Sequence, residues 1–177
     1  SHASVNGLYV VNKNRKSHHK VIINHNVENC TSSQLFKGIL QDEAKAEFNG
    51  LIEVARDAQQ TNADQLNKNL LLSNEARVES RPQLNILADD VKCSHGSTTG
   101  QLSDDELFYL QSRGLDKDYA KSVLTYSFCK ELIDKISLES ARNYAANLAF
   151  GILSSQATGK EVITSLEDNS KFKHGRY

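Results

Sequence analysis

Short apolar runs alternate with polar turns through the first hundred residues of the chain. The runs are rich in β-branched side chains, and each is bounded by Asn, Asp, Ser or Gly, which is typical of strands separated by turns. They are Leu8–Val11, Val21–Ile23, Leu51–Val54 and Leu84–Leu87, with Leu35–Phe36 and Leu70–Leu72 between them. The Glu/Ala/Lys-rich segment 41–47 spans only about two helical turns, and isolated helices that short are marginal. This part of the chain is therefore predicted to be β-structure.

The predicted strands recur at intervals of about thirty residues, so the chain was compared with itself. Two sets of positions align with offsets of 30 to 32 residues: Lys20, Gly50 and Pro82 in one set, and Thr31, Thr61 and Cys93 in the other. A degenerate repeat of short strands and turns suits the coils of a parallel β-solenoid, in which each coil buries apolar side chains against its neighbours. A β-sandwich with similar strand spacing is the alternative that this pattern leaves open.

The pattern becomes helical after Leu102. Ser103 and Glu106 form a capping-box pattern at a helix start, and Gly114 is a natural helix end. Asp116 is predicted to cap a second helix and Ser137 a third, which Gly159 would end. Apolar positions then recur every three or four residues, as in helices docked on a core. They are Ala120, Val123, Leu124, Phe128, Leu132, Ile133 and Ile136 in the second helix, with Cys129 beside them as a core residue, and Leu138, Ala141, Ala145, Leu148, Ala149 and Ile152 in the third.

These patterns divide the chain into three parts. Residues 1–102 are predicted to form the β-coils and residues 103–166 a helical domain. Residues 167–177 have little apolar content and are predicted to be a flexible tail.

Composition narrows the class of protein. The chain has 21 Lys and Arg against 22 Asp and Glu, for a formal charge of −1, so it offers no basic surface for nucleic acid. The longest apolar runs reach about four residues, far below the roughly 20 that cross a bilayer, and no membrane segment is expected. Three widely spaced cysteines, Cys30, Cys93 and Cys129, argue against a disulfide framework and for a reducing compartment. Three scattered thiols also cannot ligate a four-cysteine cluster by themselves.

The segment Lys92–Gly96 carries the most suggestive chemistry. If it is extended, Cys93 and His95 point to the same face, because side chains two residues apart on a strand do so. A thiolate and an imidazole on one face can share a transition metal, or they can form a thiolate–imidazolium nucleophile. The alternative without a chemical function is a small buried cysteine beside a surface histidine. A single pair of this kind supplies only two ligands.

Other candidate groups have simpler interpretations. His18 and His19 are neighbours on a predicted strand and point in opposite directions, so they chelate poorly. With His25, they are predicted to be exposed strand histidines. Asp89 and Asp90 are predicted to lie in a solvated turn. The sequence contains no phosphate-binding loop, nucleophile elbow or zinc-protease motif.

Four segments together resemble a known family: Cys30–Leu40, Gln65–Ser73, Arg81–Gly96 and Asp105–Gly114. They are similar to the SufB/SufD family of the SUF iron–sulfur cluster assembly machinery, and the resemblance covers nearly all of residues 20–150. The Cys93 and His95 pair matches the SufD branch better than the SufB paralogue. The resemblance implies a mainly β fold, a right-handed parallel β-helix followed by a C-terminal α-helical domain. Family members are longer, so the chain is expected to be a C-terminal portion.

The resemblance also implies a function without catalysis. A chain of this kind would be a cytoplasmic scaffold that pairs with a SufB-type paralogue through the β-helix. It would bind a SufC-type ATPase through the exposed parts of helices 104–136. His95, with Cys93 as a second candidate, would bind a transient iron–sulfur cluster at the SufB interface, completed by a cysteine of the partner. The isolated chain would hold no cofactor.

Three further expectations accompany this hypothesis. An enzyme built on a β-solenoid, such as a carbohydrate lyase or acyltransferase, would need a repeated carboxylate or histidine constellation, and none stands out. An autonomous metal-binding protein would use Cys93, His95 and Cys30. Finally, a truncated solenoid would expose an apolar end around Gly7–Val11, which predicts self-association of the chain.

Overall fold

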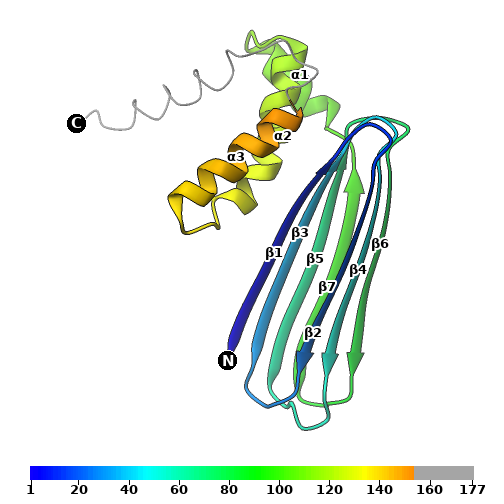
Figure 1. Ribbon diagram of the computed structural model, residues 1–177, viewed down its shortest axis with the longest axis vertical. Helices are drawn as coiled ribbons and strands as arrows, with labels where there is room; N and C mark the ends of the chain where they lie inside the picture. The colour runs from blue at the N-terminus through cyan, green and yellow to red at the C-terminus, as the bar shows by residue number, and fades with distance from the viewer. Residues whose placement is uncertain (154–177) are drawn as a thin grey trace, which may run out of the picture.

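The computed structural model describes residues 1–153 of the 177-residue chain (Figure 1). In this part, strands come first and helices follow. The strands are β1 (His2–Val11), β2 (Lys16–His25), β3 (Thr31–Leu40), β4 (Lys45–Val54), β5 (Thr61–Leu71), β6 (Arg77–Ile86) and β7 (Val91–Gly100). The helices are α1 (Asp104–Ser112), α2 (Lys117–Ile133) and α3 (Glu139–Leu153).

The strands form two parallel sheets that face each other. One sheet has the order β1-β3-β5-β7 and the other β2-β4-β6, and every neighbouring pair is parallel. The chain alternates between the sheets, so it winds through three complete coils before β7 begins a fourth. The predicted β-solenoid is confirmed, and the β-sandwich alternative is wrong because no described strand pair is antiparallel.

The register differs from the sequence alignment at three places. Cys93 pairs with Ala63, two residues from the aligned Thr61, and the other two places differ by one residue. Gly50 pairs with Pro82 as aligned, but its other neighbour is Val21 and not Lys20. Thr31 pairs with Asn62, and not with Thr61. The coils are not of equal length, because the turns after β2, β4 and β6 contain five, six and four residues. The difference matters because a slip of one residue moves every side chain of a strand to the opposite face.

The turns repeat in conformation although their sequences differ. Lys13 and Asp42 occupy the same place in successive coils, and both have a left-handed backbone, with φ of 60° and 59°. The Lys13 backbone N–H donates to the Asp42 carboxylate at 2.8 Å. Asn29 and Gln60 form a second such pair, with φ of 56° and 58°. Each coil therefore turns in the same way as the coil on which it stacks.

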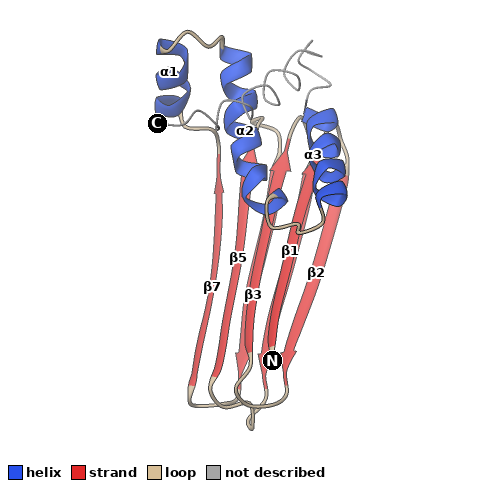
Figure 2. Cartoon of the chain, turned by 90° about the vertical axis from the view of Figure 1, so that its left-hand side faces the viewer, coloured by secondary structure: helices blue, strands red, loops and turns tan. Residues whose placement is uncertain are grey.

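Helices α2 and α3 cover the part of the outer face of the β1-β3-β5-β7 sheet that lies toward the carboxyl ends of its strands (Figure 2). Ile39 and Leu70 of the sheet pack against Cys129, Ile133 and Ala149 of the helices, with the half-buried Leu8 and Val10 beside them. Cys129 is fully buried, as predicted. Tyr9 and Val11 are buried as well, so the apolar end expected at 7–11 is largely covered by the chain itself.

A buried lysine joins the sheet to α2. Lys37 on β3 is 3% exposed, and its ammonium donates to the Phe128 carbonyl at 2.9 Å and to the Glu131 carboxylate. The same ammonium lies 4.5 Å from the centre of the Phe128 ring. The hydrogen bond from Lys37 lowers the pKa of Glu131. This contact fixes one position of α2 on the sheet.

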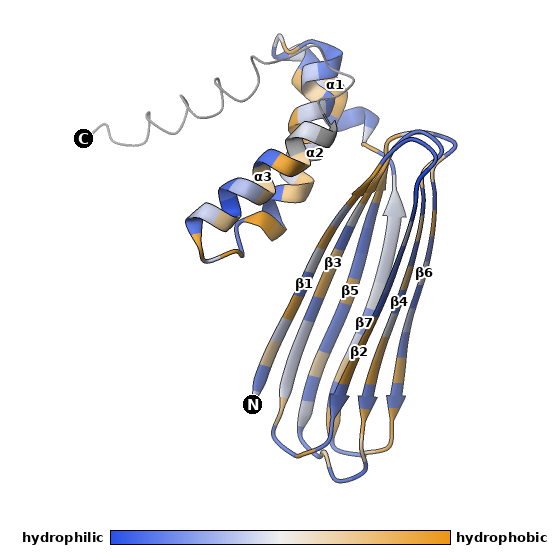
Figure 3. Ribbon diagram, viewed as in Figure 1, coloured by the Kyte–Doolittle hydropathy of each residue, from blue (hydrophilic) through white to orange (hydrophobic). Residues whose placement is uncertain are grey.

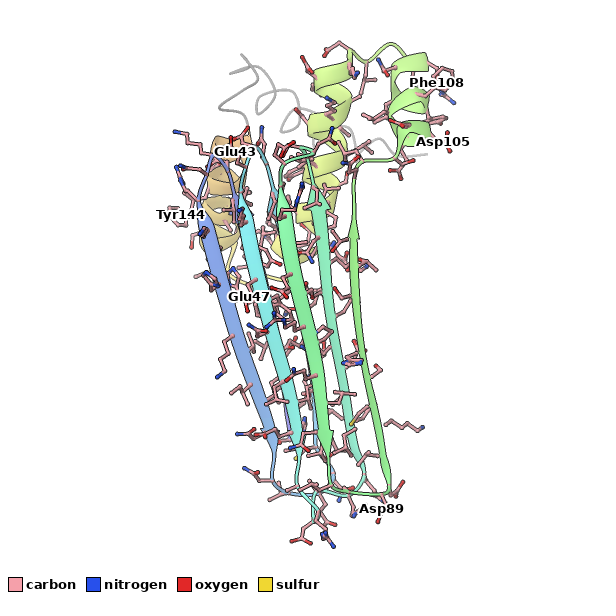
Figure 4. All side chains as sticks on the ribbon, turned by 90° about the vertical axis from the view of Figure 1, so that its right-hand side faces the viewer. Glu43, Glu47, Asp89, Asp105, Phe108 and Tyr144 are labelled. Carbon is pink, nitrogen blue, oxygen red and sulfur yellow. The ribbon has the colours of Figure 1, made fainter. Side chains whose placement is uncertain are left out.

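None of the helices within residues 1–153 lies on the outer face of the β2-β4-β6 sheet (Figure 4). The two sheets therefore differ on their outer surfaces: one is packed under helices and the other presents polar and charged side chains such as Glu47.

Two of the three predicted helix starts are confirmed. The Ser103 hydroxyl accepts from the Glu106 N–H at 3.4 Å, and the Asp116 carboxylate accepts from the Asp118 and Tyr119 N–H groups. The prediction that Ser137 caps the third helix is wrong. The first backbone hydrogen bond of α3 runs from the Arg142 N–H to the Leu138 carbonyl. Leu138, one residue after Ser137, is therefore the capping position of α3. The predicted end at Gly159 and the predicted tail at 167–177 lie outside the described residues.

The interior of the solenoid has two apolar ends and a polar middle. Apolar and polar residues alternate along the strands (Figure 3). One apolar cluster, which includes Phe36, Leu40 and Phe48, lies toward the turns after β1 and β3. The other includes Ile52 and Val54, toward the turns after β2 and β4. Between them lie buried polar side chains: Gln34, Gln65, Asn67 and Asn69.

Candidate functional site

Cys93 and His95 lie on β7, the last described strand of its sheet. Their pairing partners on β5 are Ala63 and Gln65, respectively. Ala63 and Gln65 are both buried inside the solenoid. The Cys93 and His95 side chains therefore share the inner face, as their spacing predicts. Cys93 is half-buried, while His95 is exposed because no strand follows β7 in the described part of this sheet.

The surroundings of Cys93 are apolar. Its side chain packs against the cluster that contains Ile52, Val54 and Ala63. Burial raises the pKa of the Cys93 thiol, and a backbone hydrogen bond from Ala63 offsets part of that rise. The thiol is therefore neutral near pH 7, which argues against a preformed thiolate nucleophile and leaves a ligand that ionises when a metal binds.

The third predicted ligand, Cys30, is not brought to this pair. Cys30 is buried in the turn before β3, two strands away from β7, or about 10 Å at the usual spacing between strands. Within residues 1–153, no group of three His, Cys, Asp or Glu side chains is placed to hold a metal ion. The pair of Cys93 and His95 thus remains a site of two ligands.

The edge next to this pair is open for pairing. In the described part of the chain, β7 pairs only with β5, and β6 pairs only with β4. An edge strand presents a row of unpaired backbone N–H and C=O groups, which is a template for another chain. A partner strand added beside β7 would therefore cover Cys93 and His95 and bring its own side chains next to them.

The other histidines are divided by the two faces of β2. His18 is exposed, and its Nδ1 lies 3.0 Å from Glu47 on the outer face (Figure 4). His19 faces inward, where its ring stacks on Tyr9 at 4.3 Å between ring centroids. His25 is buried, with its Nε2 2.8 Å from the Ser32 hydroxyl. The prediction of exposed histidines is therefore correct for His18 and wrong for His19 and His25, because odd-numbered positions of β2 face the interior.

The predicted solvated turn at Asp89 and Asp90 is confirmed. Both side chains are exposed between β6 and β7, and Figure 4 shows Asp89 at the end of the solenoid. The Asp90 backbone N–H donates to the side-chain oxygen of Gln59 at 2.9 Å.

Sequence reasoning missed the polar interior. Tyr9, Asn67 and Asn69 form a hydrogen-bonded network, which we call the asparagine network. The Tyr9 hydroxyl donates to Asn69 Oδ1 at 2.5 Å, and Asn67 Nδ2 donates to the Tyr9 hydroxyl at 3.2 Å. Asn69 Nδ2 donates to Asn67 Oδ1 at 2.7 Å. Burial raises the pKa of Tyr9.

A second polar pair, which we call the glutamine pair, lies next to the first. Gln34 and Gln65 are 1% and 0% exposed, and neither polar atom of either carboxamide has a hydrogen-bond partner in the structure. Gln34 pairs in register with Gln65, and Gln65 pairs with His95. The available signal was polar residues at every second position of β3 and β5, but only the correct register shows that they face inward.

The fold and the site define a parallel β-solenoid with Cys93 and His95 on the inner face of its last described strand and helices on one outer face. Comparison with known proteins identifies which solenoid this is. Residues 1–128 match the family described as "SUF system FeS cluster assembly, SufBD core domain". The chain belongs to this SufBD family of iron–sulfur cluster assembly proteins.

Individual relatives agree with the family match. The iron–sulfur cluster assembly protein SufD of Escherichia coli is 41% identical over 138 residues, which cover 78% of this chain and 33% of that protein. A SufBD family protein of Synechocystis is 46% identical over 70% of this chain and 27% of its own length. The chloroplastic protein ABCI7 of Arabidopsis thaliana is 44% identical over 77% and 28%. The chain thus spans about a third, or less, of the length of these curated relatives.

The helices of residues 1–153 were also compared with what a membrane span requires. None of them combines the length and the apolar character needed to cross a bilayer.

Proposed function

We propose that this chain acts within a non-catalytic scaffold subunit of an iron–sulfur cluster assembly complex, in the position of SufD. Its β-solenoid part, residues 1–102, pairs with a SufB-type paralogue, and the exposed parts of its helices between residues 104 and 136 bind a SufC-type ATPase. His95, with Cys93 beside it, offers ligands to a nascent cluster, which is the cargo of the complex. The remaining ligands come from the partner.

One observation carries this proposal: Cys93 and His95 lie on the inner face of an edge strand that has no neighbour on one side in the described chain. Imidazole nitrogen and thiolate sulfur are both ligands of iron. Two ligands are half of a four-coordinate set, and the open edge is where a partner strand would supply the other half. A site of this kind lacks two of its four ligands in the single chain.

The helices supply a surface of a different kind. Helix α1 projects away from the solenoid, and Phe108 on it is 74% exposed (Figure 4). Tyr109 beside it is 56% exposed, with the Arg113 guanidinium 5.1 Å from its ring centre. Exposed aromatic side chains and arginine are enriched where proteins bind one another. This end of the molecule supports the proposed contact with a SufC-type ATPase.

The three cysteines are free thiols, which fits a reducing, cytoplasmic compartment. A SufB paralogue is the nearest alternative. An autonomous metal-binding protein is less well supported because Cys30 lies two strands away from Cys93 and His95.

The test is His95→Ala in the complex assembled with SufB-type and SufC-type partners. Loss of a cluster ligand should slow cluster formation about tenfold or more. Mutation of residues that only hydrogen-bond to a metal ligand already lowers metal affinity or activity by about that factor. The matched control is His18→Ala, an exposed histidine on the outer face of β2, which should leave the rate unchanged. Both variants should still capture the two partners. Unchanged cluster formation with His95→Ala removes His95 from the site. Tight, stoichiometric metal in the isolated chain would favour the autonomous metal-binding protein instead.

A further inference from the structure

The glutamine pair is the feature of the interior that the proposed function leaves unexplained. Buried polar groups in proteins are almost always hydrogen-bonded, and an exception calls for a reason. Here, four buried polar atoms on two side chains lack a partner. Both side chains stand in one inward column of the solenoid, and His95 is the next member of that column.

The geometry of this column limits what can meet Gln65. In-register residues of neighbouring strands lie about 4.8 Å apart, and their side chains point the same way. The Gln65 carboxamide therefore has Gln34 on one side and the His95 imidazole on the other. Across the interior it lies against Gly50, where an added Cβ would fall 1.6 Å from Gln65 Nε2. A side chain at position 50 would displace the carboxamide from this place.

A hydrogen bond between the two glutamines does not complete the column. A carboxamide ladder runs in one direction, so each member passes a bond to the next and the last member keeps one free group. When Gln65 donates to Gln34, the Gln65 oxygen is left free, and His95 is the next side chain of the column. The imidazole is the adjacent side chain that can both donate and accept a hydrogen bond.

We propose that Gln65 is a positioning residue for His95. Its side-chain oxygen accepts a hydrogen bond from one ring N–H of the neutral imidazole, which fixes the tautomer and turns the other ring nitrogen toward the open edge of β7. Histidines that bind metals usually donate their second N–H to such an acceptor, which sets the ring orientation. The hydrogen bond itself does not depend on any metal; its use in cluster assembly rests on the proposed function.

The test reads the tautomer of His95 directly in the metal-free full chain. The ring nitrogens are labelled with 15N, and their chemical shifts are recorded at alkaline pH. One tautomer should predominate in the unaltered chain, and the side-chain amide protons of Gln65 should show a nuclear Overhauser effect to the His95 ring.

Three variants separate positioning from folding. Gln65→Met removes the carboxamide at nearly the same volume and should give mixed tautomers. Gln34→Met is the matched control, with equal burial in the same column but one strand further from His95, and it should keep the single tautomer. Gln65→Glu retains an acceptor oxygen and should restore the single tautomer. Circular dichroism verifies that each variant is folded, and the Overhauser effect in the unaltered chain tests the proposal even if a variant does not fold.

Mixed tautomers in the unaltered chain, or a tautomer unaffected by Gln65→Met, would overturn the proposal. This outcome is distinct from failure of the proposed function. If His95→Ala leaves cluster formation intact while the tautomer depends on Gln65, the scaffold site is wrong and the hydrogen bond stands. If His95→Ala abolishes cluster formation while the tautomer ignores Gln65, only the positioning role is wrong.

Discussion

The asparagine network and the glutamine pair are neighbours inside the same solenoid, and they solve the problem of burial differently. Asn67 and Asn69 are 0% and 4% exposed, comparable to Gln34 and Gln65. In the asparagine network, the polar atoms of the side chains meet one another, the Ser80 hydroxyl and the Phe36 carbonyl. In the glutamine pair, they meet nothing that completes a hydrogen bond.

The difference shows that burial of a polar residue has no single meaning. A paired group adds about 1 kcal/mol of stability per hydrogen bond, whereas an unpaired buried group costs about 1 to 3 kcal/mol. The asparagine network therefore stabilises the coils and fixes their register. The glutamine pair weakens the fold, so a role outside stability accounts for it better, and its position beside His95 indicates which role.

The largest effect is expected from Asn67→Leu. Leucine fills a similar volume but leaves the Tyr9 hydroxyl, the Asn69 amide and the Phe36 carbonyl each with one partner fewer, so we expect the free energy of unfolding to fall by about 3 kcal/mol. Urea denaturation followed by circular dichroism measures it. The control is Asn62→Ala, an exposed residue of the same strand, with an expected change within about 0.5 kcal/mol. If Asn67→Leu lowers the free energy of unfolding no more than Asn62→Ala does, the asparagine network does not stabilise the fold and does not differ from the glutamine pair in this respect.

Mild acid should act through the two inward histidines, His19 beside the asparagine network and His25 beside Ser32, and not through the glutamine carboxamides, which do not titrate. Burial lowers the pKa of His19, which stacks on Tyr9, and of His25. An unfolded histidine has a pKa of about 6.5, so below that pH the unfolded chain binds more protons than the folded one. Stability should be complete above about pH 6.5 and decrease as the pH falls through the folded pKa values.

Urea midpoints at pH 7.5 and 5.5 measure this dependence. The double variant His19→Gln and His25→Gln should flatten it, while His18→Gln, on the exposed face of the same strand, should not. If the urea midpoint of the double variant depends on pH as in the unaltered chain, His19 and His25 do not cause the loss of stability in acid.

The smallest effect is expected from Gln34→Met. Replacing an unpaired carboxamide with an apolar chain of similar shape removes a cost and adds apolar burial, so the free energy of unfolding should stay within about 1 kcal/mol or rise. The same urea measurement applies. A loss above about 2 kcal/mol would mean that Gln34 is hydrogen-bonded in solution, and the contrast with Asn67 would then disappear.

Much of the architecture could be predicted from local patterns. Runs of alternating residues gave the strands, and Ser103 and Asp116 gave two helix starts, because strand alternation and helix capping are local effects. The shared face of Cys93 and His95 followed from their spacing alone. The right-handed coil and the partner subunits were expected only from the resemblance to the SufB/SufD family, because residue spacing carries no information on either.

The parts that could not be predicted depend on register. The pairing offset is 29 residues between β2 and β4 but 31 between β3 and β5, and this change places Asn62, and not Thr61, beside Thr31. Without the register of each strand pair, Gln65 cannot be placed beside His95, and His19 cannot be assigned to the interior. Hydropathy also misleads here, because it assigns Gln, Asn and His to the surface, whereas the middle of this solenoid buries them.

The unequal turns have a consequence for how this architecture changes over time. The turns after β1, β3 and β5 contain four, four and five residues, and those after β2, β4 and β6 five, six and four, yet the strands stack without a bulge. Length variation is absorbed outside the ladders, so one coil can gain or lose residues without disturbing its neighbours. Such a molecule can be edited coil by coil, and the turns are the natural sites at which a lineage or an engineer can insert a new sequence.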